Sequence, residues 1–265
     1  MRLFVYDIKP ELRPYIKTIC SIECVEKCEV APFRILPDTC TELFISYTDK
    51  PLAYITKDLT EIRARSFVTF RMTQFLDVQM LPGTGCLAIC FYPETAYKFF
   101  PIPLNEVCNS VTHIGDLWKD IADEIEEKLS ILSSNEARAA VAQQYLIQRL
   151  QKYSKADGLF EHCLQQIKNS EGQLSINNIS RKNNISQRQL SRKFNDFIGL
   201  SPKEFAKINR FIHSLEYLKE NRSKTLTDTA YENGYYDQAH FIHDCKKYSG
   251  LTPKQLLSNH RKILF

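Results

Sequence analysis

The C-terminal part of the chain contains one local pattern twice. Gly199–Phe205 (GLSPKEF) recurs as Gly250–Leu256 (GLTPKQL), at an offset of 51 residues. Self-similarity at a fixed offset indicates a repeated supersecondary unit. The same offset makes four further pairs: Leu190 with Phe241, Phe194 with Cys245, Gln187 with Gln238, and Ile179 with Ala230. The fold must therefore hold two copies of one structure.

Each copy has the pattern of a helix, a tight turn and a second helix. In the first copy we expect a short helix over Ser175–Lys182, a left-handed turn at Asn183-Asn184, and a second helix capped by Ser186. The corresponding segments of the second copy are Thr227–Glu232, Asn233-Gly234 and Asp237. Each second helix ends at a glycine, Gly199 or Gly250, which suits a left-handed C-terminus.

A further helix begins after each glycine. Ser201-Pro-Lys-Glu204 and Thr252-Pro-Lys-Gln255 each place a capping hydroxyl first, proline at the first helical position and an acid or amide at the third. Two matched capping boxes at a fixed offset predict two helix-turn-helix units.

Each second helix has an inward face and an outward face. Leu190 and Phe194 should pack inward in the first copy, and Phe241 and Cys245 in the second. The outward faces carry Arg188, Ser191, Arg192 and Asn195, and then Ala239, Ile242, His243 and Lys246. Such a face can contact base edges in the major groove of DNA. The alternative is a solvated face of a helical bundle, and the repetition favours DNA.

The charge distribution agrees with this interpretation. Residues 155–265 contain 18 Lys and Arg against 11 Asp and Glu, a net charge of +7, whereas residues 1–154 contain 17 against 20, a net charge of −3. The basic half has the sign needed to meet phosphates.

The repeat resembles a known family. Gly234–Phe241 (GYYDQAHF), followed by Lys246-Lys247-Tyr248 and Gly250–Pro253 (GLTP), is similar to the signature of AraC/XylS-type transcription regulators, over about residues 159–260. The resemblance implies two helix-turn-helix subdomains joined by a long helix, here Pro202–Glu220. It also implies recognition helices in successive major grooves, double-stranded operator DNA as partner, and RNA polymerase as a further partner.

The resemblance assigns DNA contacts to Arg188, Ser191 and Arg192 in the first unit and to Gln238, Ala239, Ile242 and His243 in the second. With the helix caps and the outward faces included, the expected DNA-binding residues are Ser186, Gln187, Arg188, Ser191, Arg192 and Asn195 in the first unit, and Asp237, Gln238, Ala239, Ile242, His243 and Lys246 in the second. The family usually has arginine where His243 stands and phenylalanine where Cys245 stands. We therefore expect the second unit to bind DNA more weakly or with pH dependence, and Cys245 to loosen its packing.

The N-terminal half is expected to be rich in β-strands. Glu42–Tyr47, Ser66–Phe70 and Cys86–Tyr92 contain many β-branched and aromatic residues and are separated by turn residues. We predict an α+β multidomain chain: a β-rich domain over 1–112 (a cupin-like barrel or a sandwich), a helical linker over 113–155, and an all-α domain with two helix-turn-helix subdomains over 156–265.

Two helices are expected in the linker. Asp116–Leu132 has an apolar stripe at helical spacing, and a second helix should cover Asn135–Lys152. The stripe could support a homodimer.

Ile35–Asp38 (ILPD) and Phe99–Leu104 (FFPIPL) are similar to parts of sensor domains attached to such regulators. This implies a domain that binds a small-molecule effector or mediates dimerisation. Five aromatic residues could line a pocket or simply form the strand core: Phe33, Phe44, Tyr47, Phe67 and Phe70.

The cysteines suggest a rival function. Cys20, Cys24 and Cys28 are spaced at four and could bind a metal, sense oxidation, or accept a methyl group as in the DNA-repair relatives of this family. Those relatives hold zinc with four cysteines, and the sequence shows no comparable group. Plain packing is the simpler interpretation, also for Cys86 and Cys90. We expect no metal site and no cofactor.

No enzyme motif is visible. The sequence has no phosphate-binding glycine loop, no nucleophile elbow and no His-Glu metal helix, so a non-enzymatic protein is expected. The sequence also lacks an apolar run of membrane-spanning length and a signal peptide. Its nine cysteines are irregularly spaced, which favours reduced thiols over disulfides. We expect a cytoplasmic protein. The remaining alternative is a sensor whose helical half only binds other proteins.

Overall fold

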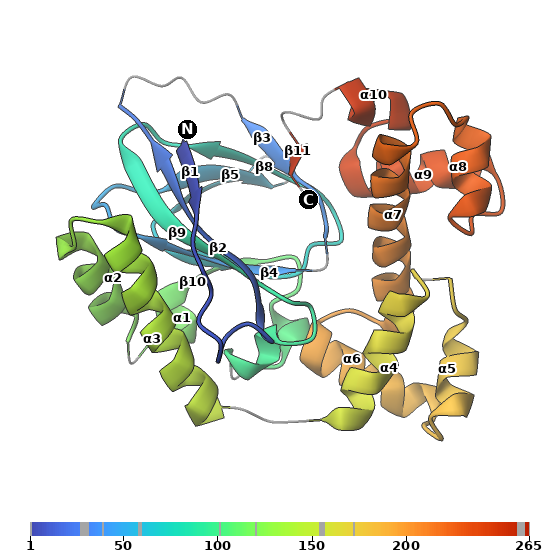
Figure 1. Ribbon diagram of the computed structural model, residues 1–265, viewed down its shortest axis with the longest axis horizontal. Coiled ribbons are helices and arrows are strands. Elements are labelled where there is room, and N and C mark those ends of the chain that lie inside the picture. Colours follow the sequence, from blue (N-terminus) through green and yellow to red (C-terminus); the bar gives the residue numbers. More distant parts are fainter. Residues whose placement is uncertain are drawn as a thin grey trace.

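The computed structural model describes residues 2–26, 32–38, 40–57, 60–100, 102–119, 121–153, 157–171, 173–258 and 263–264. Figure 1 shows a β-rich N-terminal part beside a helical C-terminal part. Among the helices of these residues, none has both the length and the apolar character needed to cross a membrane.

The N-terminal part contains two sheets. The first has six strands in the order β1 (Arg2–Val5), β2 (Ile16–Cys24), β9 (Thr84–Phe91), β4 (Thr41–Ser46), β7 (Phe67–Thr69) and β10 (Val111–His113). The second has five strands in the order β11 (Ile263–Leu264), β3 (Phe33–Ile35), β8 (Leu76–Met80), β5 (Ala53–Lys57) and β6 (Thr60–Ala64). All pairs are antiparallel except β11 with β3, where the end of the chain joins the sheet.

The two sheets face each other. Phe44 and Phe67 of the first sheet stack at 4.8 Å between ring centroids. They share one buried cluster with Ile55, Val78 and Met80 of the second sheet. The expected β-rich domain is thus confirmed as a sandwich, and the three expected strands lie within two residues of β4, β7 and β9. We call these two sheets and the segments between their strands the β sandwich.

Helices pack against the other face of the first sheet. They are α1 (Ile114–Leu117), α2 (Ala122–Ile131) and α3 (Asn135–Tyr153). The expected helix over Asn135–Lys152 is confirmed, but the single helix over Asp116–Leu132 is wrong. The chain breaks at Trp118, because its buried indole stacks on Phe100 at 5.6 Å and donates to the carbonyl of Phe99 at 3.3 Å.

The apolar stripe of α2 is covered within the chain. Ile125 and Leu129 are fully buried and belong to the same core as Ala142 and Leu146 of α3. The stripe suggested for a homodimer is therefore not available to a second copy.

The C-terminal part is helical, as expected. Its helices are α4 (Gly158–Asn169), α5 (Ile176–Lys182), α6 (Gln187–Ile198), α7 (Pro202–Glu220), α8 (Leu226–Glu232), α9 (Gln238–Ser249) and α10 (Pro253–Ser258). In Figure 1, α4–α6 lie at one end of α7 and α8–α10 at the other. We call these groups the first and the second helix-turn-helix unit. The expected connecting helix, Pro202–Glu220, is confirmed as α7.

Candidate nucleic-acid interface

The turn of the first unit is built as the sequence predicts. Asn184 has a positive φ of 50°, and Gly199 ends α6 with a φ of 82°. Ser186 and Gln189 form a reciprocal capping box at the start of α6. Leu190 and Phe194 are fully buried, so the opposite side of α6 faces outward.

The second unit repeats this geometry. Gly234 in the turn has a φ of 69°, and the Asp237 carboxylate accepts from the His240 amide at 2.7 Å to cap α9. Phe241 and Cys245 are fully buried, so Cys245 fills the place of the family's phenylalanine inside the core. The short helix α8 begins one residue before the expected start, at a capping box formed by Thr225 and Asp228 that the sequence analysis did not identify.

The outward faces of α6 and α9 are accessible. The side chains expected to contact DNA divide into exposed positions (Ser186, Gln187, Arg188, Arg192, Asn195, Ala239, His243 and Lys246) and half-buried positions (Ser191, Asp237, Gln238 and Ile242). Arg188, Arg192 and Lys246 form no ion pair with any other residue that the structure describes. Each unit thus presents uncompensated positive charge on its second helix.

The two equivalent glutamines hold their units together. Gln187 donates to the Asn177 side chain of α5 at 2.6 Å, and Gln238 accepts from Thr227 of α8 at 2.9 Å. We call α6 and α9, the second helices of the two units, the recognition helices. Each amide therefore joins the start of a recognition helix to the first helix of its unit.

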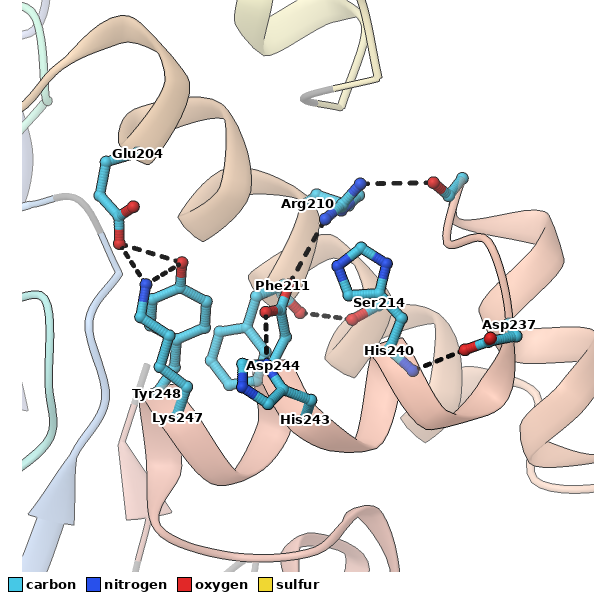
Figure 2. A network of polar contacts seen from close by, with 11 residues as sticks. Glu204, Arg210, Phe211, Ser214, Asp237, His240, His243, Asp244, Lys247 and Tyr248 are labelled. Carbon is cyan, nitrogen blue, oxygen red and sulfur yellow. Dashed lines mark hydrogen bonds and ion pairs between the residues drawn. The ribbon is translucent and has the colours of Figure 1, made fainter.

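Figure 2 shows how α7 holds α9. Arg210 of α7 and Asp244 of α9 are 3.4 Å apart, with side chains 15% and 5% exposed. The Arg210 guanidinium also lies over the Tyr235 ring, 4.2 Å from its centroid, and donates to the Gly234 carbonyl at 3.3 Å. One arginine thus contacts the turn and the recognition helix of the second unit, a role that the sequence analysis did not assign.

Glu204 adds a second link between these helices (Figure 2). Its amide donates to Ser201, as a capping box requires, but its carboxylate accepts from Lys247 at 2.6 Å and from the Tyr248 hydroxyl at 3.1 Å. In a complete capping box the Glu204 carboxylate would also accept from the Ser201 amide, but here it contacts α9 instead. Burial alone would raise the pKa of Glu204, but the hydrogen bonds from Lys247 and Tyr248 and the charges of Lys247 and Lys207 together lower it. The matching box at Thr252 and Gln255 is complete.

Both recognition helices end against the β sandwich. A Cβ atom on Gly199 would lie 2.7 Å from the carbonyl oxygen of Leu104, which belongs to the short 3₁₀ helix η2 (Leu104–Glu106). A Cβ atom on Gly250 would lie 2.7 Å from the ring of Phe75. The two glycines are equivalent positions of the repeat, so both units contact the sandwich at the same point of their structure.

Arg34 of β3 makes the polar contact with the second unit. It donates to the Ser249 carbonyl at 2.8 Å and forms two bonds of 2.7 Å with the Asp77 carboxylate. Its guanidinium also stacks over Phe75, 3.7 Å from the ring centroid. The carbonyl that it binds is one of the unpaired groups at the end of α9.

The sandwich encloses a cavity of about 270 Å³. Phe33, Phe44 and Phe67 line it, as expected for pocket aromatics. Tyr47 and Phe70 do not: Tyr47 lies under the Arg138 guanidinium at 4.0 Å, and Phe70 packs on Phe100. The aromatic set therefore divides between pocket and core.

A few polar groups interrupt the apolar wall. They are Lys17, Thr18, Asp38, Glu42 and Thr69, together with the thiols of Cys20 and Cys90. Burial raises the pKa of the Glu42 carboxyl to about 7.

The first two cysteines of the triplet lie on a strand, whereas the sequence analysis considered a helix. Cys20 and Cys24 are buried on β2, and Cys28 lies outside the described residues. Burial raises the pKa of the Cys20 thiol to about 11, which disfavours the reactive thiolate.

Comparison with known proteins agrees with the helix-turn-helix geometry. Residues 179–259 match the model of a helix-turn-helix domain, and residues 6–113 match a domain of unknown function, DUF6597. The probable transcription factor PqrA of Proteus vulgaris is 30% identical over 94 residues, which are 36% of this chain and 75% of PqrA. The chain belongs to the AraC/XylS family of transcription regulators. As a family member it is a DNA-binding regulator of transcription.

Two solved structures of ToxT from Vibrio cholerae are also similar to most of the chain. One covers 91% of this chain and 96% of ToxT, at 11% identity and a TM-score of 0.46. The other, bound to (E)-4-(8-methylnaphthalen-1-yl)but-3-enoic acid, covers 91% and 97%, at 12% identity and a TM-score of 0.46.

Proposed function

We propose that one chain binds an operator with both recognition helices, α6 and α9, in two successive major-groove segments. The observation that carries this proposal is the repetition of an exposed, capped recognition helix at both ends of α7. With 19 residues, α7 is about 28 Å long, close to the roughly 34 Å between groove segments one helical turn apart. Lysine and arginine contacts to phosphate supply most of the affinity, and base contacts supply the sequence preference.

Arg188, Ser191 and Arg192 make the base and phosphate contacts of the first unit in this proposal. Gln238, Ala239, Ile242 and His243 occupy the corresponding places in the second. His243 is 74% exposed, so its ring can reach DNA, although it lacks a permanent charge and its Nδ1 lies 3.6 Å from the Asp244 carboxylate.

Selection of bound sequences from a random DNA pool, at about physiological salt, tests the proposal. We expect a motif of two blocks spaced by one helical turn. Arg192→Ala should lose about 1–3 kcal/mol of discrimination at one block, because a bidentate contact to a base is removed. The matched control is Arg13→Ala, since Arg13 is exposed on the β sandwich. A uniform loss on selected and random DNA would show that Arg192 contacts only phosphate, and failure to select any motif would contradict the proposal itself.

The β sandwich is the regulatory part of the proposal: an effector bound in its cavity changes the contact with the second unit. Phe33 and Ile35 of β3 line the cavity, while Arg34 between them holds Ser249. Side chains alternate along a strand, so a ligand that displaces the inner face of β3 also displaces Arg34. An effector shifts the DNA-competent population only through such differential contacts.

Arg34→Ala tests this connection. We expect operator affinity to fall about fivefold, because docking of α9 on the sandwich pre-orders the second unit for DNA. Amide hydrogen exchange in α9 and α10 should become faster, while exchange in α5 and α6 should not change. Arg13→Ala again serves as the control. Unchanged exchange and unchanged affinity would show that the Arg34 contact has no part in regulation.

The remaining parts of the proposal concern partners and setting. In this proposal the domain boundaries follow residues 112 and 155. The regulator acts in the cytoplasm, contacts RNA polymerase and catalyses no reaction.

We place the contact with a second copy of the chain at β1, an edge strand whose Leu3, Phe4 and Val5 are exposed. The raised pKa of Cys20 argues against the alternative of alkyl transfer to the N-terminal cysteines.

A further inference from the structure

Side chains from the connection between β3 and β4 and from β9 meet beside the cavity, which Asp38 and Cys90 line. Asp38 follows β3, Cys40 precedes β4 and Cys90 lies on β9. One carboxylate oxygen and the two sulfur atoms all lie within 4.8 Å of one another. We propose that Asp38, Cys40 and Cys90 bind a thiophilic divalent metal ion, of which zinc is the representative.

The distances suit such an ion. In a tetrahedral zinc site with Zn–S bonds of 2.3 Å, two ligand sulfur atoms lie about 3.8 Å apart. The three candidate atoms already lie within 4.8 Å of one another, so side-chain shifts of about 1 Å or less close the site around the ion. Two sulfurs and one carboxylate oxygen are a ligand set that zinc accepts.

The backbone holds two of the ligands in place. The Cys40 amide donates to Oδ1 of Asp38 at 2.9 Å, which fixes the carboxylate and leaves its other oxygen for the ion. Cys40 itself is only 7% exposed, and Cys90 is held in the ladder between β2 and β4. A site built on a strand and a tight turn is preorganised for binding.

We place the fourth ligand position in the cavity, because Asp38, Cys90 and Glu42 all line it. Glu42 stands directly opposite Cys90 in the pairing of β4 with β9, so their side chains share one face of the sheet. The Glu42 carboxylate accepts from Thr69 at 3.4 Å and forms no ion pair with any described residue. A cation bound at the cluster would supply a neighbouring positive charge for this carboxylate.

The local charge also balances. Two thiolates and the Asp38 carboxylate carry three negative charges, which a divalent ion reduces to one. Lys17 lines the same cavity as Asp38 and Cys90 and supplies a positive charge there. The ion therefore offsets most of the negative charge that the three ligands carry, as a partly buried site requires.

The test uses the reduced, full-length chain after treatment with a chelator. We expect calorimetry to show one zinc ion bound per chain, with about two protons released, because zinc takes cysteine as thiolate. Cobalt in place of zinc should give the visible bands of a tetrahedral ion and thiolate-to-cobalt charge transfer. Neither readout needs DNA or an organic effector, so the result is independent of the proposed function.

Single variants assign the ligands. Cys40→Ala and Cys90→Ala should each weaken zinc binding at least about a hundredfold and remove the charge-transfer band. Cys86→Ala is the matched control, because Cys86 is a buried cysteine of the same strand outside the cluster, and it should bind zinc like the unchanged chain. Circular dichroism must show that all three variants are folded.

Three results would overturn the proposal. They are absence of stoichiometric zinc binding by the reduced chain, binding that survives in folded Cys40→Ala and Cys90→Ala, and equal loss of binding in Cys86→Ala. Formation of a Cys40–Cys90 disulfide in air, without zinc uptake by the reduced chain, would identify the pair as thiols that serve oxidation instead.

Discussion

Asp244→Ala is expected to lower the free energy of unfolding by about 3 kcal/mol, because it leaves the Arg210 guanidinium buried without its anionic partner. The two side chains are 15% and 5% exposed, so water replaces little of the lost interaction. Arg210 keeps its contacts with the Gly234 carbonyl and the Tyr235 ring, but neither offsets a full positive charge.

Urea unfolding of the full-length chain measures this loss, and amide hydrogen exchange locates it. We expect faster exchange in α8 and α9 and little change in α4–α6. Because α9 carries His243 and Lys246, operator binding by the second unit should weaken as its helix loosens.

Two controls separate the buried pair from general damage to α9. The double variant Arg210→Met with Asp244→Leu should be more stable than Asp244→Ala, because two apolar side chains leave no charge unpaired. Lys247→Ala, which removes the more exposed ion pair with Glu204, should cost less than about 1 kcal/mol. If Lys247→Ala destabilises as much as Asp244→Ala, burial of the Arg210 charge is not the cause.

Local signals predicted the C-terminal half well. The caps at Ser186 and Asp237, the left-handed glycines and the bounds of α7 each depend on residues within a few positions of one another. Such interactions are formed by the segment itself, so the sequence pattern is sufficient to predict them. The same holds for the exposed faces of α6 and α9, which follow from helical periodicity.

Contacts between distant segments explain what the sequence did not predict. The Asp116–Leu132 pattern continues through Trp118, but the buried contact of its indole with Phe99 and Phe100 ends the helix there. Glu204 has the spacing of a capping box, yet Lys247 and Tyr248 approach from α9 and take its carboxylate. In both cases tertiary packing outweighed a correct local signal.

The N-terminal sites show the same limit. No sequence pattern connects Cys90 with Asp38 and Cys40, because the pairing of β4 with β9 brings these distant segments together. The sequence around Arg34 does not indicate its contact with Ser249, which is 215 residues away in the chain. Strand order in a sandwich depends on such long-range pairing, so the sequence could indicate β-rich structure but not this arrangement.

Gly199→Ala is expected to cost about 3 kcal/mol and to separate the first unit from the β sandwich. Gly199 has a φ of 82°, where an alanine costs roughly 1–2 kcal/mol because its Cβ crowds the backbone. The added methyl would also lie 2.7 Å from the carbonyl oxygen of Leu104, a backbone atom that yields only if η2 or α6 moves. Overpacking of this kind costs about 1–3 kcal/mol.

Gly234→Ala is the matched control for this prediction. Its φ of 69° carries the same backbone strain, but its Cβ would meet the flexible Gln173 side chain at 3.0 Å instead of a backbone atom. We expect a loss of about 1 kcal/mol, and the difference between the two variants measures the contact of α6 with the sandwich. Urea unfolding gives both values, and hydrogen exchange in η2 and α6 should rise only in Gly199→Ala. Equal losses of unfolding free energy in the two variants, with unchanged exchange in η2, would mean that the β sandwich does not position the end of α6. The regulatory contact would then be that of the second unit alone.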